Sequence, residues 1–162
     1  MIGGSIIDET EYMAKAILTT AEQLCQQQGE KLTELRKTIL LILAEQETAL
    51  TAYQLLDLLQ QARPNAKPPT VYRGLEFLQQ LGLVHRIDST NSYLVCHHSD
   101  HKHSAQFFIC NRCGLVEELK LDNLTEQLEQ EALQRSFQIQ SQTIEVSGIC
   151  GKCQQAAGNL KK

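Results

Sequence analysis

The sequence predicts an α+β protein in which an N-terminal winged helix-turn-helix unit is followed by a smaller α/β unit. Apolar residues recur at helical spacing as far as Gly82, and beyond it the pattern changes to that of short strands. The later part also carries two Cys-x-x-Cys pairs. Helices followed by a small hairpin are typical of a winged helix, in which the helix before the hairpin enters the major groove of DNA.

Each predicted helix has a recognisable start or stop. Asp8, Thr33 and Thr51 are placed to cap the first turns of the first three helices. Gly29 and Gly82 are suited to end the first and the fourth, because glycine adopts the left-handed conformation that commonly follows a helix. The predicted helices cover residues 8–28, 33–43, 52–62 and, after the proline-rich turn at 63–69, about 70–81.

The second half alternates strands with one helix. Two short strands, at 84–87 and 93–95, flank a polar turn at 88–91, and a polar stretch at 99–104 predicts a hinge. The second unit is predicted to contain strands at 107–109, 115–119 and 137–146, a helix at 123–135 and frayed last residues. The domain prediction is a DNA-binding domain at 1–96, a hinge at 97–104, a dimerisation and metal-binding domain at 105–156 and a tail at 157–162.

Composition excludes some classes of protein. No apolar run approaches the roughly 20 residues that span a bilayer, and residues 1–5 lack the basic and apolar segments of a secretory signal. We therefore expect a cytoplasmic protein whose cysteines bind metal rather than form disulfides. The net charge of −4 gives no overall basic footprint for nucleic acid. A local cluster can still dominate such a contact, and the candidates are Arg63, Lys67, Arg73 and Arg86.

Four of the six cysteines form two pairs, Cys110-Asn-Arg-Cys113 and Cys150-Gly-Lys-Cys153. Two cysteines on one tight turn reach two adjacent corners of a tetrahedron, so the pairs predict a closed four-thiolate zinc site. Thiol redox chemistry is the alternative, but a redox pair usually begins a helix, whereas Gly114 and a predicted strand follow Cys113. Because a core alone is marginal in a unit of about 60 residues, zinc would contribute folding energy.

All five histidines fall within residues 85–103, together with Cys96. A thiolate combined with imidazoles favours zinc over manganese or iron. A metal ion that draws its ligands from the wing, the hinge and the second unit would bind to one arrangement of the domains better than to others. That preference is the physical basis of a switch. The candidate ligands are His85, Cys96, His97, His98, Asp100, His101, His103, Glu117 and Glu118.

Residues 67–73, Lys-Pro-Pro-Thr-Val-Tyr-Arg, lead into the fourth helix with a hydroxyl, a phenol and a guanidinium. These groups suit contacts to phosphate and to a purine edge. A capped amphipathic helix with a solvated arginine is the alternative. Cys25 has no cysteine partner nearby and is expected to be a small buried residue of the first helix.

With these residues in place, the chain resembles the ferric uptake regulator (Fur) family, and within it the zinc-sensing branch. The resemblance covers roughly residues 15–155 and is most specific at 52–56, 66–73, 84–85, 89–93 and 108–114. It implies a homodimeric winged-helix repressor that binds AT-rich palindromic operators when metal-loaded, with one or two dimers per operator.

The resemblance also implies roles by position. It implies a structural zinc on Cys110, Cys113, Cys150 and Cys153, and a regulatory zinc on His85, Cys96, His103 and Glu118, hence two ions per subunit. His101 is the alternative to His103. A third, weaker site could be formed by His97, His98, Asp100 and His101. Tyr53 and Arg73 would read bases, while Lys67, Thr70 and Tyr72 would contact the DNA backbone.

Three alternatives accompany the leading hypothesis, a zinc-responsive repressor of zinc-uptake genes with no membrane or small-molecule partner. Sensing of peroxide, iron, manganese or nickel is the first, and Cys96 is the feature that argues for zinc. The second is a metal-dependent or thiol-redox enzyme. A full ligand set of His, Cys, His and Glu would leave no open position for substrate, so no enzymatic activity is expected. The third, a zinc buffer, leaves the recognition helix unexplained.

Overall fold

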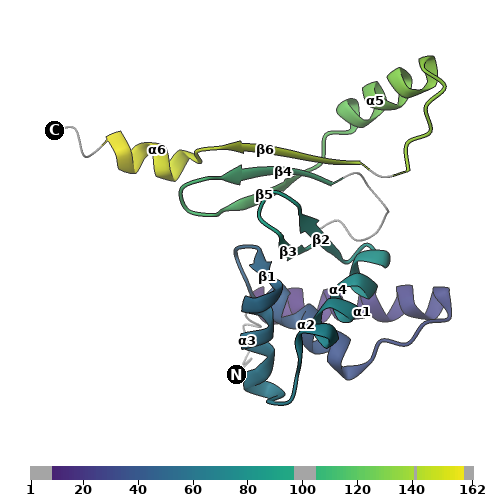
Figure 1. The fold of residues 1–162 in the computed structure, drawn as a ribbon, viewed down its shortest axis with the longest axis vertical. Helices are drawn as coiled ribbons and strands as arrows, with labels where there is room; N and C mark the ends of the chain where they lie inside the picture. The colour runs from purple at the N-terminus through teal and green to yellow at the C-terminus, as the bar shows by residue number, and fades with distance from the viewer. Residues whose placement is uncertain (1–8, 97–104, 141, 159–162) are drawn as a thin grey trace, which may run out of the picture. The chain divides into compact units, whose positions relative to one another are not determined.

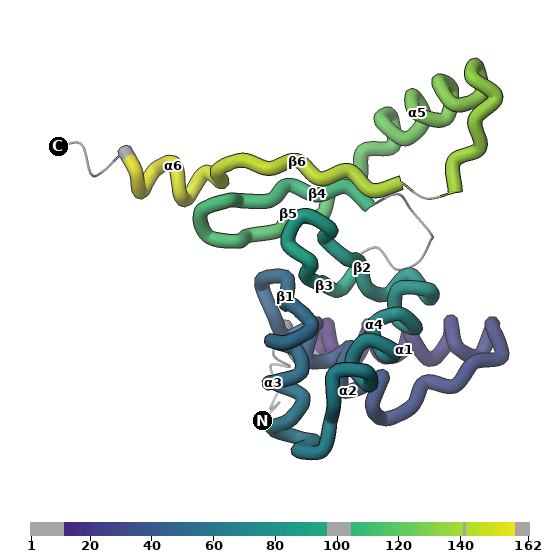
Figure 2. Tube along the Cα trace, viewed as in Figure 1, coloured from purple at the N-terminus to yellow at the C-terminus, as the bar shows by residue number. Residues whose placement is uncertain are grey.

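The computed structural model describes residues 9–96, 105–140 and 142–158 (Figures 1 and 2). Internal contacts divide the chain into two compact units, residues 1–101 and 102–162. Helices and a hairpin form the first unit, and a small sheet with helices forms the second. The predicted class, a winged helix-turn-helix unit followed by a small α/β unit, is confirmed.

Helices dominate the first unit, and a small antiparallel sheet with strand order β1-β3-β2 completes it (Figure 1). The hairpin of β2 and β3 is the wing. Its turn closes as predicted, because Asn91, at a φ of 48°, donates its backbone N–H to Asp88 O at 3.3 Å. The elements are α1 (Glu9–Gln28), α2 (Glu34–Ala44), β1 (Leu50–Thr51), α3 (Ala52–Ala62), α4 (Pro68–Gln80), β2 (Val84–Ile87) and β3 (Ser92–Val95).

Capping residues explain where the helices of the first unit begin. Thr33 accepts a hydrogen bond from the Arg36 backbone N–H at the start of α2. Thr51 and Gln54 form a reciprocal capping box at the start of α3. The helix α4 begins at Pro68, two residues earlier than predicted, because proline is tolerated in a first turn whose N–H groups have no helical partner.

The core of the first unit is aliphatic. Helix α4 lies very close to α2 at Gly74, where a Cβ atom would be 2.5 Å from Ile39 Cδ1. The guanidinium of Arg36 adds a second contact between these helices, 3.3 Å from the centroid of the Phe77 ring. The largest fully buried aliphatic side chains of the helices are Ile39, Leu40, Leu55, Leu59, Leu75 and Leu78. Cys25 is also buried, as predicted.

The second unit is built on a three-stranded sheet with strand order β5-β4-β6. The central strand β4 pairs antiparallel with β5 and parallel with β6, so β5 and β6 are its edges. The fully buried Phe107 lies in β4, whereas helix α5 contains no buried residue. The elements are β4 (Ala105–Cys110), β5 (Val116–Leu119), α5 (Asp122–Gln134), β6 (Thr143–Gly148) and α6 (Gly151–Gly158).

The strand predicted at 137–146 is wrong in its first part. All six residues of β4 pair with residues 143–148, so residues 137–140 have no strand to pair with. Ser136 ends the preceding helix with a φ of 52°, and the Phe137 N–H bonds back to Ala132 O at 2.8 Å. Helix α6, at 151–158, is not among the predicted elements and includes residues 157 and 158 of the predicted tail, whereas residues 159–162 lie outside the described residues.

Candidate metal centres and nucleic-acid interface

The two cysteine pairs lie side by side because β4 and β6 run parallel. Cys110, the last residue of β4, is opposite Gly148, the last residue of β6, and Cys150 follows two residues later. The four Sγ atoms lie within 4.8 Å of one another, and Cys113 Sγ is 3.7 Å from Cys150 Sγ. Tetrahedral thiolates at the zinc–sulfur distance of about 2.3 Å are roughly 3.8 Å apart, so this donor set fits zinc.

Besides the contacts among the thiols, three hydrogen bonds to or from backbone groups join the two cysteine turns. The Cys150 N–H donates to Cys110 Sγ at 3.3 Å, and the Asn111 N–H donates to Gly148 O at 2.9 Å. The third comes from a side chain, since Arg112 Nη1 donates to Cys153 O at 2.8 Å. The six cysteines, all within the described residues, form no disulfide. The turns are therefore held together by hydrogen bonds and not by a covalent link.

Hydrogen bonding makes the four thiols chemically unequal. The backbone N–H of Cys150, followed by those of Cys113 and Arg112, lowers the pKa of Cys110 to about 6. A side-chain hydrogen bond with Cys150, followed by burial and the other thiols, raises the pKa of Cys153 to about 12. Cys110 is thus the thiol most ready to bind a metal ion as a thiolate at neutral pH.

The wing brings together one imidazole and one thiol. His85 lies in β2 and is half-buried, whereas Cys96 directly follows β3 and is 1% exposed. A backbone hydrogen bond from Cys96 N to Leu83 O, 2.9 Å long, extends the β2–β3 pairing and fixes the position of Cys96. The ligand atoms of His85 and Cys96 lie within 4.8 Å, close enough to bind one ion.

The other predicted ligands of the histidine-rich region belong to the second unit or lie outside the described residues. Glu118 is half-buried in β5, opposite Phe107 of β4. Glu117 is exposed beside it, opposite Phe108. The remaining candidates, His97, His98, Asp100, His101 and His103, lie outside the described residues, as does the predicted hinge at 97–104.

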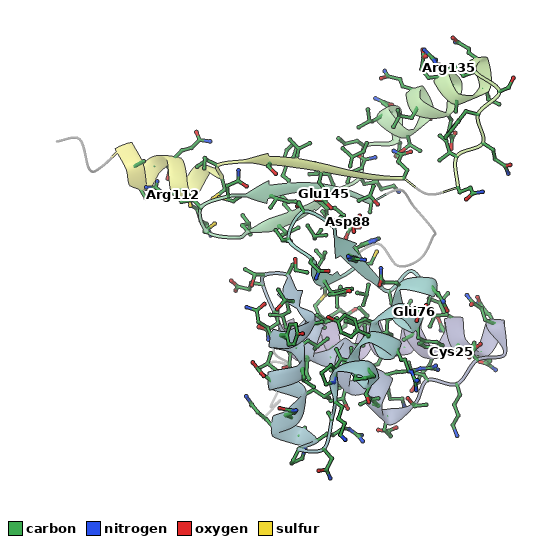
Figure 3. The ribbon with its side chains drawn as sticks, in the orientation of Figure 1. Cys25, Glu76, Asp88, Arg112, Arg135 and Glu145 are labelled. Carbon is green, nitrogen blue, oxygen red and sulfur yellow. The ribbon has the colours of Figure 1, made fainter. Side chains whose placement is uncertain are left out.

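The predicted DNA-contacting side chains are accessible. Tyr53, in the first turn of α3, is 68% exposed. On α4, Tyr72, Arg73 and Glu76 form an exposed face, opposite the residues that pack in the core. Figure 3 labels Glu76 of this face. Lys67 is exposed and Thr70 is half-buried at the start of the same helix. The basic candidates Arg63, Lys67, Arg73 and Arg86 are all exposed.

Comparison with known proteins identifies the class. The model of the ferric uptake regulator family matches residues 27–147. The chain belongs to this family. The zinc uptake regulation protein of Escherichia coli strain K12 is 42% identical to this Fur-family chain over 138 residues, which cover 85% of the chain and 81% of that protein. Similarity to the zinc-sensing branch is thereby confirmed.

Solved structures of zinc uptake regulators also resemble this Fur-family chain. A zinc uptake regulator complexed with zinc and DNA has a TM-score of 0.85 and 40% identity, covering 90% of this chain and 97% of that one. A holo form of XcZur has a TM-score of 0.78 and 38% identity, covering 88% and 99%. Members of the Fur family are metal-responsive transcriptional regulators, so the prediction that this chain is not an enzyme is confirmed by its family.

Arg112 was not among the predicted site residues, although it lies inside the first cysteine pair. Its hydrogen bond spans 41 positions in the sequence, so only the folded second unit reveals it. None of the helices in the described ranges is long and apolar enough to cross a membrane.

Proposed function

We propose that this Fur-family regulator is a cytoplasmic zinc-responsive repressor that binds AT-rich palindromic operators of zinc-uptake genes as a zinc-loaded dimer. The observation that carries the proposal is the pair of His85 and Cys96 on the wing, with ligand atoms within 4.8 Å. A thiolate beside an imidazole is a donor set that favours zinc over the harder manganese and iron ions. Similarity to the zinc uptake regulation protein of Escherichia coli also supports zinc as the metal.

We assign two zinc ions to each subunit. The structural ion binds Cys110, Cys113, Cys150 and Cys153, and this assignment is supported by sulfur separations that suit tetrahedral zinc. The regulatory ion binds His85 and Cys96 together with Glu118 and with His103 or, alternatively, His101. The assignment of Glu118 and of His103 or His101 follows from the resemblance to the family. The third site, on His97, His98, Asp100 and His101, stays a prediction.

The DNA interface is proposed on α3 and α4. Tyr53 and Arg73 would contact base edges, while Lys67, Thr70 and Tyr72 would contact the backbone. The exposure of Tyr53 and of the Tyr72–Arg73 face supports this assignment. The similar zinc uptake regulator solved with zinc and DNA is consistent with it. In this scheme residues 1–96 bind DNA, 97–104 are the hinge and 105–156 carry the dimer contacts, with 157–162 as a tail.

Zinc would act by selecting one arrangement of these domains. A regulatory ion whose ligands come from the wing and from later residues binds only those arrangements in which the ligands meet. The population then shifts toward the DNA-binding arrangement by the difference in zinc affinity between the two states. When free zinc falls, the ligands separate and the repressor leaves the operator.

The dimer is proposed to form through the second unit. Its sheet has two edge strands, and exposed apolar side chains lie along it, among them Phe108, Val146 and Ile149. These three also line a cavity of about 370 Å³ beside Cys150. Phe108→Glu is expected to weaken the dimer in sedimentation analysis, whereas Glu126→Gln, an exposed position of α5 that does not line this cavity, is the control. Stoichiometric titration of an operator distinguishes one dimer from two.

The decisive experiment is operator binding measured as free zinc is buffered. Cys96→Ser is expected to remove the zinc response while leaving a folded dimer, and Cys110→Ser to unfold the second unit. Cys25→Ala is the matched control, because it removes a buried thiol that is no candidate ligand. Operator affinity that does not depend on zinc in the wild type would contradict the proposal. A metal competition in which manganese or iron displaces zinc would favour a sensor of that metal.

A further inference from the structure

Arg112 connects the two cysteine turns of the second unit. It lies between the ligand candidates Cys110 and Cys113, and its Nη1 donates to the backbone carbonyl of Cys153 at 2.8 Å. The label in Figure 3 places Arg112 at the end of the sheet from which α6 begins. The two bonded residues are 41 positions apart, so this contact exists only when both turns are in place.

Two further hydrogen bonds between the turns are donated by backbone N–H groups and involve only their inner halves. They run from Cys150 N to Cys110 Sγ and from Asn111 N to Gly148 O. Neither reaches Cys153, which lies three residues further along, in the first turn of α6. The sulfur of Cys153 interacts with the thiols of Cys110 and Cys113, and the Arg112 side chain adds a hydrogen bond that ties the backbone of Cys153 to the first cysteine turn.

We infer that Arg112 is a positioning residue of the structural zinc site, which slows zinc release by holding Cys153 against the first cysteine turn. The inference rests on the proposed function, because it takes the four-cysteine cluster to be a zinc site. Zinc release requires its Zn–S bonds to break, and a broken bond re-forms readily when the thiolate stays close to the ion. A hydrogen bond that restrains the Cys153 backbone keeps its thiolate within reach of the ion.

Charge alone offers a competing explanation, and the second cysteine pair supplies its control. Four thiolates and one Zn²⁺ carry a net charge of about −2, which any nearby cation would offset. Lys152 occupies the same place in its pair as Arg112, directly before the second cysteine. Unlike that of Arg112, its side chain makes no hydrogen bond or ion pair within the described part of the chain. Arg112→Gln and Lys152→Gln therefore remove the same charge but only the first removes the tie.

The test measures zinc transfer from full-length protein to a coloured chelator. All variants carry Cys96→Ser, so that the regulatory site is absent and the four-cysteine site alone releases metal. Arg112→Gln is expected to release zinc about tenfold faster than the parent, the effect of losing one hydrogen bond from a charged donor. Lys152→Gln is expected to change the rate less than about twofold, and Arg112→Lys, which keeps a donor, to recover most of the loss.

Salt separates the two explanations further. A charge effect should fade as added salt shortens the screening length to roughly 3 Å at 1 M, whereas the loss of a direct tie should persist. Equal rates for Arg112→Gln and Lys152→Gln would overturn the role of Arg112 while leaving the zinc site intact. A Cys96→Ser parent that contains no zinc would instead overturn the structural-site proposal itself. If Arg112→Gln does not fold, Arg112→Met, which keeps the aliphatic part of the side chain but has no hydrogen-bond donor, replaces it in the comparison with Lys152→Gln.

Discussion

Gly74 is predicted to be a position where alanine destabilises the protein although it is the better helix former. The residue lies in the middle of α4, directly after Tyr72 and Arg73, and packs against α2. An added Cβ would lie 2.5 Å from Ile39 Cδ1, which is a steric clash between the two carbon atoms. Ile39 is fully buried, so its side chain cannot turn away without displacing other core residues.

The magnitude follows from two opposing effects. Alanine favours the helix over glycine by about 1 kcal/mol, whereas forcing an extra methyl into a packed core costs about 1–3 kcal/mol. Gly74→Ala alone should therefore lower the free energy of unfolding by about 0–2 kcal/mol. Ile39→Val deletes Cδ1 and leaves Cγ1, which is 3.8 Å from the new Cβ and in ordinary contact. In that background the clash disappears, and Gly74→Ala should raise stability by about 1 kcal/mol.

The assay is a double-mutant cycle of Gly74→Ala and Ile39→Val by urea unfolding. The expected signature is a change of sign: the alanine destabilises beside isoleucine and stabilises beside valine. Operator affinity should follow the same order, because displacement of α4 would move Tyr72 and Arg73. Additive effects, with Gly74→Ala stabilising in both backgrounds, would refute the packing argument.

Three further predictions concern the caps, the wing and the thiols. Thr51→Ala removes the capping box of α3 and is expected to cost about 1 kcal/mol in urea unfolding, whereas Thr51→Ser should cost much less. Asn91 has a φ of 48°, so Asn91→Val should destabilise the wing by roughly 1–2 kcal/mol and Asn91→Gly should not, as thermal unfolding can show. In metal-free protein the pKa of the Cys110 thiol is about 6 in the folded state, against 9.0 for an ordinary cysteine. The thiolate therefore contributes folding stability that is fully present above pH 9 and is lost as the pH falls through about 6. Thiolate absorbance that lacks a step near that pH, or a step that survives Cys110→Ser, would contradict this assignment.

The helices of the first unit could be predicted because their signals are local. The bounds of α3, 52–62, follow from the Thr51 cap at one end and the residues before Pro64 at the other. The ends of the first and fourth helices are likewise indicated by single residues, Gly29 and Gly82, both of which have a positive φ. The four-cysteine cluster could be predicted because the spacing of ligands within a turn is also a local property.

The missed features depend on partners that are distant in the sequence. Strand β1 has two residues and exists only because Leu50 and Thr51 pair with the wing strand β3. Strand β6 begins at Thr143 because this residue pairs with Ala105, the first residue of β4. The sequence of residues 137–146 carries no information about where β4 begins. Likewise the Arg112–Cys153 hydrogen bond requires both cysteine turns to be folded. The metal and DNA assignments of individual residues stay predictions.

The separation of the cysteine pairs has a consequence for biosynthesis. A ribosome releases residues 9–96 before any of β4, so the winged unit can fold during translation. Cys110 and Cys113 then emerge with two thiols and no second pair, because β5, α5 and β6 must follow before Cys150 and Cys153 appear. On the proposed assignment of the structural zinc, a nascent chain could bind the ion with all four sulfurs only after Cys153 has emerged. Under the same assignment, zinc shortage during synthesis would limit how much newly made regulator completes its second unit, separately from any effect on regulator already made.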